Sequence, residues 1–546
     1  MSDSIGTYLI QRLLAHGIQH VFGVPGDFVL GFNKLLEESP IQFINTCDEQ
    51  GAGFAADAYA RLQGLGCVCV TYSVGGLKIA NTTAQAFAEK SPVVVISGAP
   101  GTTECIKNPL LHHKVRNFDT QFKIFQELTV AATVLDNPRT AFAEIDRVLA
   151  AANRYKRPVY IELPRDMVNK PGNPDLQTSS PPEISDPDTL AEALKEAVGL
   201  INAAQQPVIL ADVEIHRFGL QDALLQLTET TNIPVAETIL GKSVLNEPHP
   251  NHVGLYAGAL GSEFARQYVE SSDCLILLGV FLTDLNLGLF TAHLDPKRSI
   301  YVTSEKTSIQ LHSYDQIRLQ DFVQGLIQAK IQRRELNLPP SSHRPLKFEV
   351  VPNQAVTIAR LFEQLNSFLS DDTIVIADVG DALFGGLGMF IHGRTRFLSP
   401  AYYASLGFAV PASLGAQLAE PSARPLVLVG DGAFQMTGME LSAIARYGLN
   451  PIIVVLNNQG YGTERPMLDG KFNDVLNWQY SRIPEILGTG CGFEIHTEDE
   501  LAAALSASRS HLESFCILDV HLEKHDMSAA LNRLTQALGE RVVTTS

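Results

Sequence analysis

The stretch PLVLVGDGAFQMTGMELSAIARYGLNPIIVVLNNQGYG, residues 425–462, contains two apolar runs separated by a helical pattern. Short runs that are apolar throughout, such as PLVLV and PIIVVL, are typical of strands buried on both faces of a parallel sheet. Between them, the glycines of residues 430–432 predict a tight turn, and Thr437 with Glu440 predicts a capping box that opens a helix. A strand, a crossover helix and a second strand indicate a βαβ unit of a doubly wound sheet.

Polar residues follow both of these strands, at the edge of the sheet where ligands bind in such folds. Asp431 comes directly after the first strand, and Asn458 comes directly after the second. A carboxylate, an amide oxygen and free backbone carbonyls such as that of Gly460 suit a hard cation like Mg²⁺. Such an ion takes its remaining ligands from water and phosphate. The stretch therefore predicts a magnesium site that tethers a phosphorylated ligand.

The same alternation of apolar runs and helical patterns continues through the rest of the chain. Two stretches rich in Pro and Ser, at 169–189 and 337–345, read as linkers. The sequence predicts an α/β fold of three doubly wound parallel-sheet domains, at residues 1–170, 190–335 and 346–546. The runs expected to be strands are 67–73, 92–98, 158–164, 207–213, 274–280, 373–381, 425–432 and 451–458.

Bulk composition narrows the classes of function. The 546 residues carry 41 basic and 59 acidic side chains, a formal net charge of −18, which argues against binding to nucleic acid or to an anionic membrane. The seven cysteines are scattered without a zinc-binding spacing, as free thiols of a reducing compartment are. No leader peptide and no apolar run of about 20 residues is evident. We therefore expect a cytoplasmic protein without a membrane segment.

Two adjacent histidines, His112 and His113, occur in LLHHKVR at residues 110–116. Ligands of one metal on a helix are usually spaced four residues apart, so this spacing does not indicate a helical metal site. Histidine titrates near neutral pH, so a pair of histidines indicates a site that handles protons. The sequence around the pair does not by itself say which reaction needs them.

The cofactor-like stretch at 430–458 resembles the signature of thiamine-diphosphate enzymes. Further segments resemble the 2-oxo-acid decarboxylases, a group that includes pyruvate, indolepyruvate, phenylpyruvate and branched-chain 2-oxo-acid decarboxylases. These segments are GVPGDF (23–28), CDEQGAGFAADAYAR (47–61), the histidine pair and NNQGYGTERP (457–466). The resemblance covers the whole chain and implies a pyrimidine-binding, a central and a diphosphate-binding domain. It also implies conversion of a 2-oxo acid to an aldehyde and CO2 with thiamine diphosphate and Mg²⁺.

The resemblance implies a role for each matching residue. Glu49 would hydrogen-bond the pyrimidine N1′ of the cofactor and promote loss of the C2 proton. The resemblance assigns substrate orientation and proton transfer to the product to Asp27, His112, His113 and Glu464. Leu406 would support the thiazolium ring, and the Ala404 carbonyl would face the pyrimidine amino group. The implied cofactor residues are Glu49, Ala404, Leu406, Gly430, Asp431, Gly432, Ala433, Asn458, Gly460 and Tyr461, with Asp431, Asn458 and Gly460 as metal ligands.

Two segments depart from the usual decarboxylase pattern. Residues 114–119, KVRNFD, are more basic and bulkier than the stretch that normally follows the histidines, and Thr463 replaces the Ile or Val often found before the late glutamate. Both segments border the substrate pocket in relatives. We therefore expect a branched or aromatic 2-oxo acid larger than pyruvate, with pyruvate as the alternative.

Other functions remain as alternatives. A carboligase similar to acetolactate synthase or benzaldehyde lyase would use the same cofactor but would join a second carbonyl compound. A flavin oxidase of the same superfamily is disfavoured because the middle third shows no GxGxxG motif. A non-catalytic binding protein is disfavoured because every proposed chemical position is filled. In relatives the cofactor lies between two subunits, so the resemblance implies a homodimer or homotetramer with active sites at the subunit interface.

Overall fold

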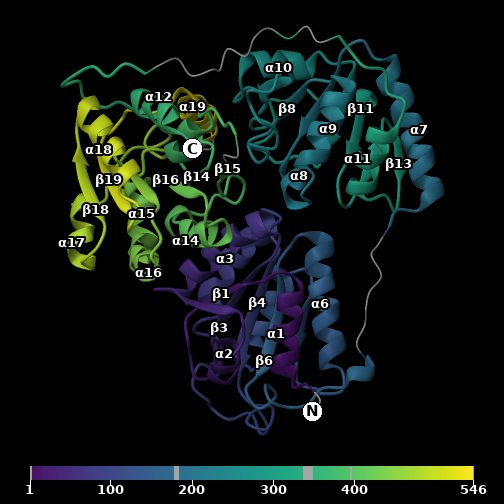
Figure 1. Cartoon of the computed structure of the whole chain (residues 1–546), viewed down its shortest axis with the longest axis vertical. Coiled ribbons are helices and arrows are strands. Elements are labelled where there is room, and N and C mark those ends of the chain that lie inside the picture. The colour runs from purple at the N-terminus through teal and green to yellow at the C-terminus, as the bar shows by residue number, and fades with distance from the viewer. Residues whose placement is uncertain (1–2, 177–183, 336–337, 339–347, 394–395, 545–546) are drawn as a thin grey trace. The chain divides into compact units, whose positions relative to one another are not determined.

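The computed structural model describes residues 3–176, 184–335, 338, 348–393 and 396–544 (Figure 1). The chain forms two compact units. The first comprises residues 1–182, 410–422 and 437–449, and the second comprises 183–409, 423–436 and 450–546. Parts of both expected linkers, at 177–183 and at 337 and 339–345, lie outside the described residues, as do the ends of the expected third domain.

The first unit contains a six-stranded sheet in the order β2-β1-β3-β4-β6-β5, and all of its strand pairs are parallel. Helices pack against the faces of this sheet and form an apolar core with it. The strands are β1 (His20–Gly23), β2 (Gln42–Asn45), β3 (Gly66–Val70), β4 (Val93–Ala99), β5 (Ala132–Val134) and β6 (Val159–Pro164). The helices are α1 (Ile5–Ala15), α2 (Leu30–Glu37), α3 (Glu49–Gln63), α4 (Ala80–Ala88), α5 (Thr120–Leu128) and α6 (Ala141–Tyr155).

The second unit contains two sheets. The first has the order β13-β12-β11-β10-β7-β8-β9 and is parallel except at the β11-β12-β13 edge, which is antiparallel. Its strands are β7 (Pro207–Ala211), β8 (Val235–Glu237), β9 (His252–Leu255), β10 (Cys274–Leu278), β11 (Ser299–Val302), β12 (Thr307–Ile309) and β13 (His312–Tyr314). Its helices are α7 (Pro187–Ala203), α8 (Val213–Arg217), α9 (Gln221–Thr231), α10 (Glu263–Glu270) and α11 (Leu319–Gln328).

The other sheet of this unit is parallel throughout, in the order β15-β14-β16-β17-β19-β18. Its strands are β14 (Thr373–Ala377), β15 (Arg396–Leu398), β16 (Arg424–Gly430), β17 (Ile452–Asn457), β18 (Cys491–Ile495) and β19 (Cys516–His521). The helices of this part of the second unit are α12 (Ile358–Phe368), α13 (Asp381–Gly386), α15 (Asp431–Thr437), α17 (Ile483–Leu487), α18 (Glu498–Ser510) and α19 (Ala529–Thr544). Two further helices from the same stretch of sequence, α14 (Ala409–Ala419) and α16 (Leu441–Arg446), belong to the first unit apart from Ala409.

The expected fold class is confirmed, because the chain contains three predominantly parallel sheets with helices between their strands. Each of the eight apolar runs expected to be strands overlaps one. All seven cysteines are free, as expected from their spacing. Within the described residues, no helix combines the length and the apolar character needed to cross a bilayer.

Two local expectations at residues 430–440 are wrong. The helix after β16 begins at Asp431 itself, and Thr437 is its last residue and makes no capping bond. The Glu440 carboxylate accepts hydrogen bonds from the backbone N–H groups of Cys47 (3.1 Å) and Asp48 (3.0 Å) instead of closing a box with Thr437. Neither Gly430 nor Gly432 has a positive φ, so the backbone conformation does not require glycine at either position.

Candidate active site

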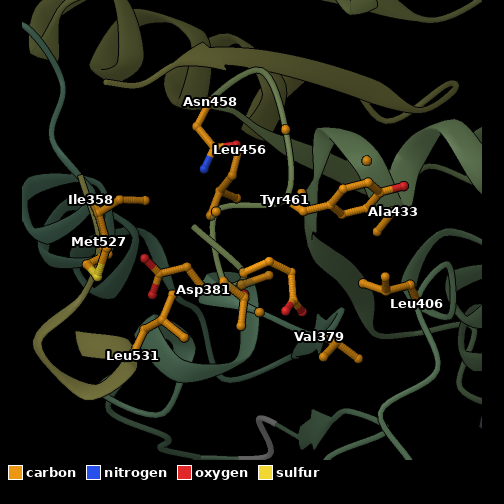
Figure 2. A pocket seen from close by; sticks show the side chains of 18 of the residues that line it. Ile358, Val379, Asp381, Leu406, Ala433, Leu456, Asn458, Tyr461, Met527 and Leu531 are labelled. Atoms are coloured by element: carbon orange, nitrogen blue, oxygen red, sulfur yellow. The ribbon is translucent and has the colours of Figure 1, made fainter. Parts of the chain in front are cut away.

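A cavity of about 230 Å³ lies where β16 and β17 end in the second unit (Figure 2). Its walls include backbone and side chains from several segments that are far apart in the sequence. All of the predicted cofactor residues except Glu49 and Asp431 line it, together with the predicted catalytic Glu464. These lining residues are Ala404, Leu406, Gly430, Gly432, Ala433, Asn458, Gly460, Tyr461 and Glu464.

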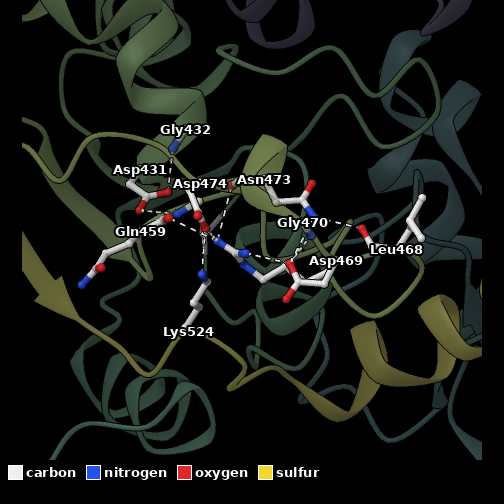
Figure 3. Close-up of polar contacts among 11 residues, drawn as sticks. Asp431, Gly432, Gln459, Leu468, Asp469, Gly470, Asn473, Asp474 and Lys524 are labelled. Atoms are coloured by element: carbon white, nitrogen blue, oxygen red, sulfur yellow. Dashed lines mark hydrogen bonds and ion pairs between the residues drawn. The ribbon is translucent and has the colours of Figure 1, made fainter.

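Asp431 is fully buried at the edge of this cavity, at the start of α15. One carboxylate oxygen accepts the Gly432 N–H (2.7 Å) and the other accepts the Gly460 N–H (3.0 Å), as Figure 3 shows for Asp431 and Gly432. Burial raises the pKa of this carboxyl to about 6, although these hydrogen bonds favour its charged form. A hard cation beside Asp431 would stabilise the charged form, so the donor set fits Mg²⁺ held between Asp431, Asn458 and a phosphate.

The loop after β17 is fixed by a buried arginine. The Arg465 guanidinium forms ion pairs with Asp469 (2.9 Å) and Asp474 (2.8 Å), and Lys524 also contacts Asp474 (2.8 Å; Figure 3). Arg465 therefore does not form the surface pair with Glu464 that their adjacency in the sequence allows. Glu464 lies at the cavity instead.

Two glycines near the start of this loop leave no room for a side chain. A side chain at Gly460 would collide with the carbonyl oxygen of Asn473, and one at Gly432 would lie 2.7 Å from the Tyr461 ring. Gln459 has a φ of 61°, a left-handed conformation that is uncommon for residues other than glycine. The loop thus brings its backbone close to the cavity at a cost in conformational strain.

Ala404 and Leu406 lie on a second strained segment. Ala404 has a φ of 58°. The segment is held by Asp378, whose buried carboxylate accepts the N–H groups of Gly407 (3.1 Å) and Ala409 (2.8 Å). Burial raises the pKa of Asp378 to about 6. The sequence analysis did not identify Asp378, although it directly follows β14 and the rule used for Asp431 applies to it equally.

Asp381 is a second carboxylate that the sequence analysis missed. It begins α13 and lines the cavity (Figure 2). One of its oxygens accepts the Ser528 N–H (2.8 Å), and the other is buried without a hydrogen-bond partner among the described residues. Burial raises its pKa to about 6. Its position suits hydrogen bonding to a ligand rather than direct contact with phosphate, because two anions would repel each other.

In the first unit, Asp27, His112 and His113 form one cluster. The His112 Nε2 atom lies 2.8 Å from a carboxylate oxygen of Asp27, and the two imidazole centroids are 4.8 Å apart. Phe28 stacks on the His112 ring at 4.8 Å. His113 has a φ of 65°, and its buried Nδ1 atom has no hydrogen-bond partner in the described part of the chain. The structure therefore brings together three of the four residues expected to orient substrate and transfer protons.

Arg165 belongs to the same cluster and was missed. Its guanidinium lies over the Phe28 ring at 5.0 Å, approaches Asp27 at 3.9 Å and donates to Glu104 at 2.9 Å. It directly follows β6, so the search for polar residues after each strand could have found it. Its cation offsets part of the negative charge of the Asp27 and Glu104 carboxylates.

Glu49 is the first residue of α3 and is nearly buried. Its carboxylate lies 2.7 Å from the Lys78 ammonium, which also contacts Asp48. The backbone just before Glu49 is held by Glu440, and a side chain at Gly51 would collide with that carboxylate. Lys78 had no signal in the sequence, because an exposed lysine is commonplace.

Comparisons with known proteins match all three parts of the chain. Residues 3–121 match the N-terminal TPP binding domain of the thiamine pyrophosphate enzymes, 194–329 match their central domain, and 378–520 match their C-terminal TPP binding domain. An indole-3-pyruvate decarboxylase of Azospirillum brasilense is 37% identical over 97% of each chain. An alpha-keto-acid decarboxylase of Mycobacterium avium (strain 104) is 32% identical over 98% of this chain and 96% of the relative. A probable pyruvate decarboxylase, Pdc101, of Schizosaccharomyces pombe is 32% identical over 97% and 95%.

Proposed function

Because this chain belongs to the thiamine pyrophosphate enzymes, and among them to the 2-oxo-acid decarboxylases, we propose that it converts a branched-chain or aromatic 2-oxo acid to the aldehyde and CO2. The observation that carries this proposal is the cavity whose lining combines the cofactor residues with Glu464. Thiamine diphosphate, when bound, supplies the electron sink for the electron pair that CO2 leaves behind. We also propose domains at 1–170, 190–335 and 346–546, and each of the three domain matches lies within one of them.

Residues of the cavity would hold the cofactor. Asp431, Asn458 and the Gly460 carbonyl would bind Mg²⁺, and the backbone of residues 430–433 would face the diphosphate. Leu406 and Ala404 would support the cofactor rings, and Tyr461 would close one wall. Glu49 would hydrogen-bond the pyrimidine N1′ and hold the proton there.

The histidine cluster would orient the substrate and move protons. His112 is oriented by its hydrogen bond to Asp27, and the Nδ1 atom of His113, which has no partner among the described residues, would bond a ligand. Positioned acid–base groups contribute about 10²–10⁴-fold to turnover. We expect His113→Ala and Glu464→Gln each to lower kcat by at least about 10²-fold while affinity for thiamine diphosphate stays nearly unchanged. Near-normal turnover in both variants would contradict their roles. Glu485→Gln, at an exposed carboxylate of the second unit, serves as the control.

Two observations bear on the size of the substrate's side chain. The relative that acts on indole-3-pyruvate is more similar to this chain than the probable pyruvate decarboxylase is, at 37% against 32%. The segment after the histidine pair, which borders the substrate pocket in relatives, also departs from the usual decarboxylase pattern, and its Lys114 ammonium lies 4.4 Å from the Phe118 ring centroid. The similarity and this departure are the grounds for proposing an acid larger than pyruvate, with pyruvate as the alternative.

The test is a panel of 2-oxo acids assayed with thiamine diphosphate and Mg²⁺. The panel contains pyruvate, 3-methyl-2-oxobutanoate, 4-methyl-2-oxopentanoate, phenylpyruvate, indolepyruvate and benzoylformate. We expect free aldehyde and CO2, with the highest kcat/KM for a branched or aromatic acid. Fastest turnover of pyruvate would correct the substrate assignment. A 2-hydroxy ketone as the main product would favour the carboligase alternative, and no CO2 from any acid would overturn the proposal.

A further inference from the structure

Three possible metal ligands, Glu494, His496 and His521, lie with Asp519 at one edge of the parallel sheet that contains β16 and β17. Glu494 lies on the edge strand β18, His496 follows two residues later, and Asp519 and His521 lie two residues apart on β19 (Figure 1). Glu494 and Asp519 are register partners. Because side chains alternate along a strand, these four residues project from the same face of the sheet.

The distances within this cluster are too long for good hydrogen bonds. The Glu494 Oε1 atom lies 3.4 Å from His496 Nε2 and 3.6 Å from His521 Nε2, and His521 Nε2 lies 3.7 Å from an oxygen of Asp519. Hydrogen bonds between such atoms measure about 2.7–3.2 Å. A tetrahedral ion with bonds of about 2.0–2.1 Å separates its ligands by about 3.3–3.4 Å. The ligand atoms of Glu494, His496 and His521 all lie within 4.8 Å of one another, which approaches the spacing of a metal site. The two imidazoles stack with their centroids 4.2 Å apart, so one ring must turn for both Nε2 atoms to face one ion.

The polar atoms of the cluster also leave a position open. The Nε2 atom of His521 is buried and has no hydrogen-bond partner among the described residues, which is costly for an imidazole nitrogen. Asp519 accepts the Asn457 amide at 2.8 Å through one oxygen, and its other oxygen lies 3.7 Å from His521 Nε2, where it adds negative charge beside the proposed ligands. Glu494 and His496 are exposed, so an ion could enter from solvent.

We propose that Glu494, His496 and His521 bind a divalent transition-metal ion such as Zn²⁺, with water as the fourth ligand. The Glu494 carboxylate and the neighbouring Asp519 carboxylate together balance the charge of such an ion. Imidazole ligands favour Zn²⁺ and Co²⁺ over Mg²⁺, which binds oxygen. The site is therefore distinct in chemistry from the oxygen-lined cavity around Asp431, and it does not depend on the proposed function.

The test is a Co²⁺ titration of the untagged protein saturated with thiamine diphosphate and Mg²⁺, followed by visible absorption. Tetrahedral Co²⁺ with nitrogen ligands absorbs strongly, whereas octahedral Co²⁺ with oxygen ligands absorbs weakly. We expect strong absorption that saturates at about one Co²⁺ per chain and that Zn²⁺ removes. Outer-shell substitutions weaken metal sites by about 10–100-fold, so loss of a direct ligand in His496→Gln or His521→Gln should weaken binding at least about 10-fold.

Two variants control for other histidines. His312→Gln removes an exposed histidine that lies 3.0 Å from Glu196, its one acidic partner in the described part of the chain. His113→Asn removes a ligand of the other group of close ligand atoms, Asp27, His112 and His113. Both should keep the strong absorption. Absorption retained in His496→Gln, lost in His113→Asn, or absent from the unsubstituted protein would each overturn the proposal. His496 is exposed and lies beyond the end of β18, so its variant tests the site even where His521→Gln fails to fold.

Discussion

The Glu49 carboxylate contacts the Lys78 ammonium. A catalytic role and a purely structural role of this carboxylate predict different results when Glu49 or Lys78 is substituted. If Glu49 holds a proton at the thiamine pyrimidine, Glu49→Gln should abolish H/D exchange at C2 of the cofactor. Lys78 is half exposed, and such ion pairs are worth about 0–1 kcal/mol, so Lys78→Gln should retain turnover within about 5-fold. Equal losses in the two variants would mean that the ion pair alone matters.

Gly430 and Gly432 differ in the space around them, so we expect their substitutions to have different effects. A methyl group at Gly432 would lie 2.7 Å from the Tyr461 ring, whereas one at Gly430 would meet nothing within 4 Å. We expect Gly432→Ala to destabilise the cofactor-free protein by about 1–3 kcal/mol through overpacking, and Gly430→Ala to leave it unchanged. Gly430 lines the cavity, so its added methyl should instead weaken thiamine diphosphate binding. Denaturation of the cofactor-free protein and cofactor titration measure the two effects. Unchanged cofactor affinity in Gly430→Ala would argue against this cavity as the cofactor site.

The sequence predicted individual residues only where a local pattern or a family resemblance marked them. Asp431 and Asn458 follow apolar strands, and both lie where that pattern predicts. The left-handed conformations of His113, Ala404 and Gln459 carry no sequence signal, because none of these residue types requires a positive φ. Such strain is imposed by tertiary packing and clusters at functional sites, so only the structure could reveal it.

At the scale of elements, Glu440 shows how a correct motif can have the wrong partner. Thr437 and Glu440 have the spacing of a capping box, yet the Glu440 carboxylate caps the backbone before α3. Local spacing cannot distinguish these outcomes, because both satisfy N–H groups at a helix start. Glu440 thereby holds the helix that carries Glu49.

Burial raises the pKa of Glu440 to about 7, from a model-compound value of 4.5. The folded protein therefore keeps this proton to higher pH than the unfolded chain, and its contribution to stability is lost as pH rises from about 4.5 to 7. Glu440→Gln should remove this pH dependence. The free energy of unfolding of the variant, relative to that of the unsubstituted protein, should therefore rise by up to roughly 3 kcal/mol between pH 5 and 7.5. Urea denaturation midpoints at both pH values measure it. Glu440→Ala, which leaves the Cys47 and Asp48 N–H groups without an acceptor, should be less stable than Glu440→Gln by about 1–3 kcal/mol.

Strands were easier to predict than the short edge elements. Runs of Val, Ile and Leu without a polar residue gave the central strands of all three sheets, because only burial on both faces permits such runs. The β12–β13 hairpin was not expected. Its strands have three residues each, and exposed polar residues such as His312 and Ser313 hide the period of two.

At the scale of the whole molecule, the predicted site residues divide between the two compact units. Asp27, Glu49, His112 and His113 belong to the first, and the residues of the cavity belong to the second. The resemblance to decarboxylases implies that the two sets meet across a subunit interface. Neither the composition nor the strand pattern predicts whether two subunits share a site, because both describe a single chain.

Mixing of two inactive variants tests this shared site. Glu49→Gln and Asp431→Asn should each be inactive alone, one through proton handling and the other through loss of the metal ligand. If each active site combines the first unit of one subunit with the second unit of another, a mixed dimer contains one intact site and one doubly damaged site. Co-expression at equal levels should then restore about a quarter of the full activity, since half of the dimers are mixed. Sedimentation must show a dimer or tetramer of the 59.4 kDa chain, and a mixture that stays inactive would mean that each chain builds its own site.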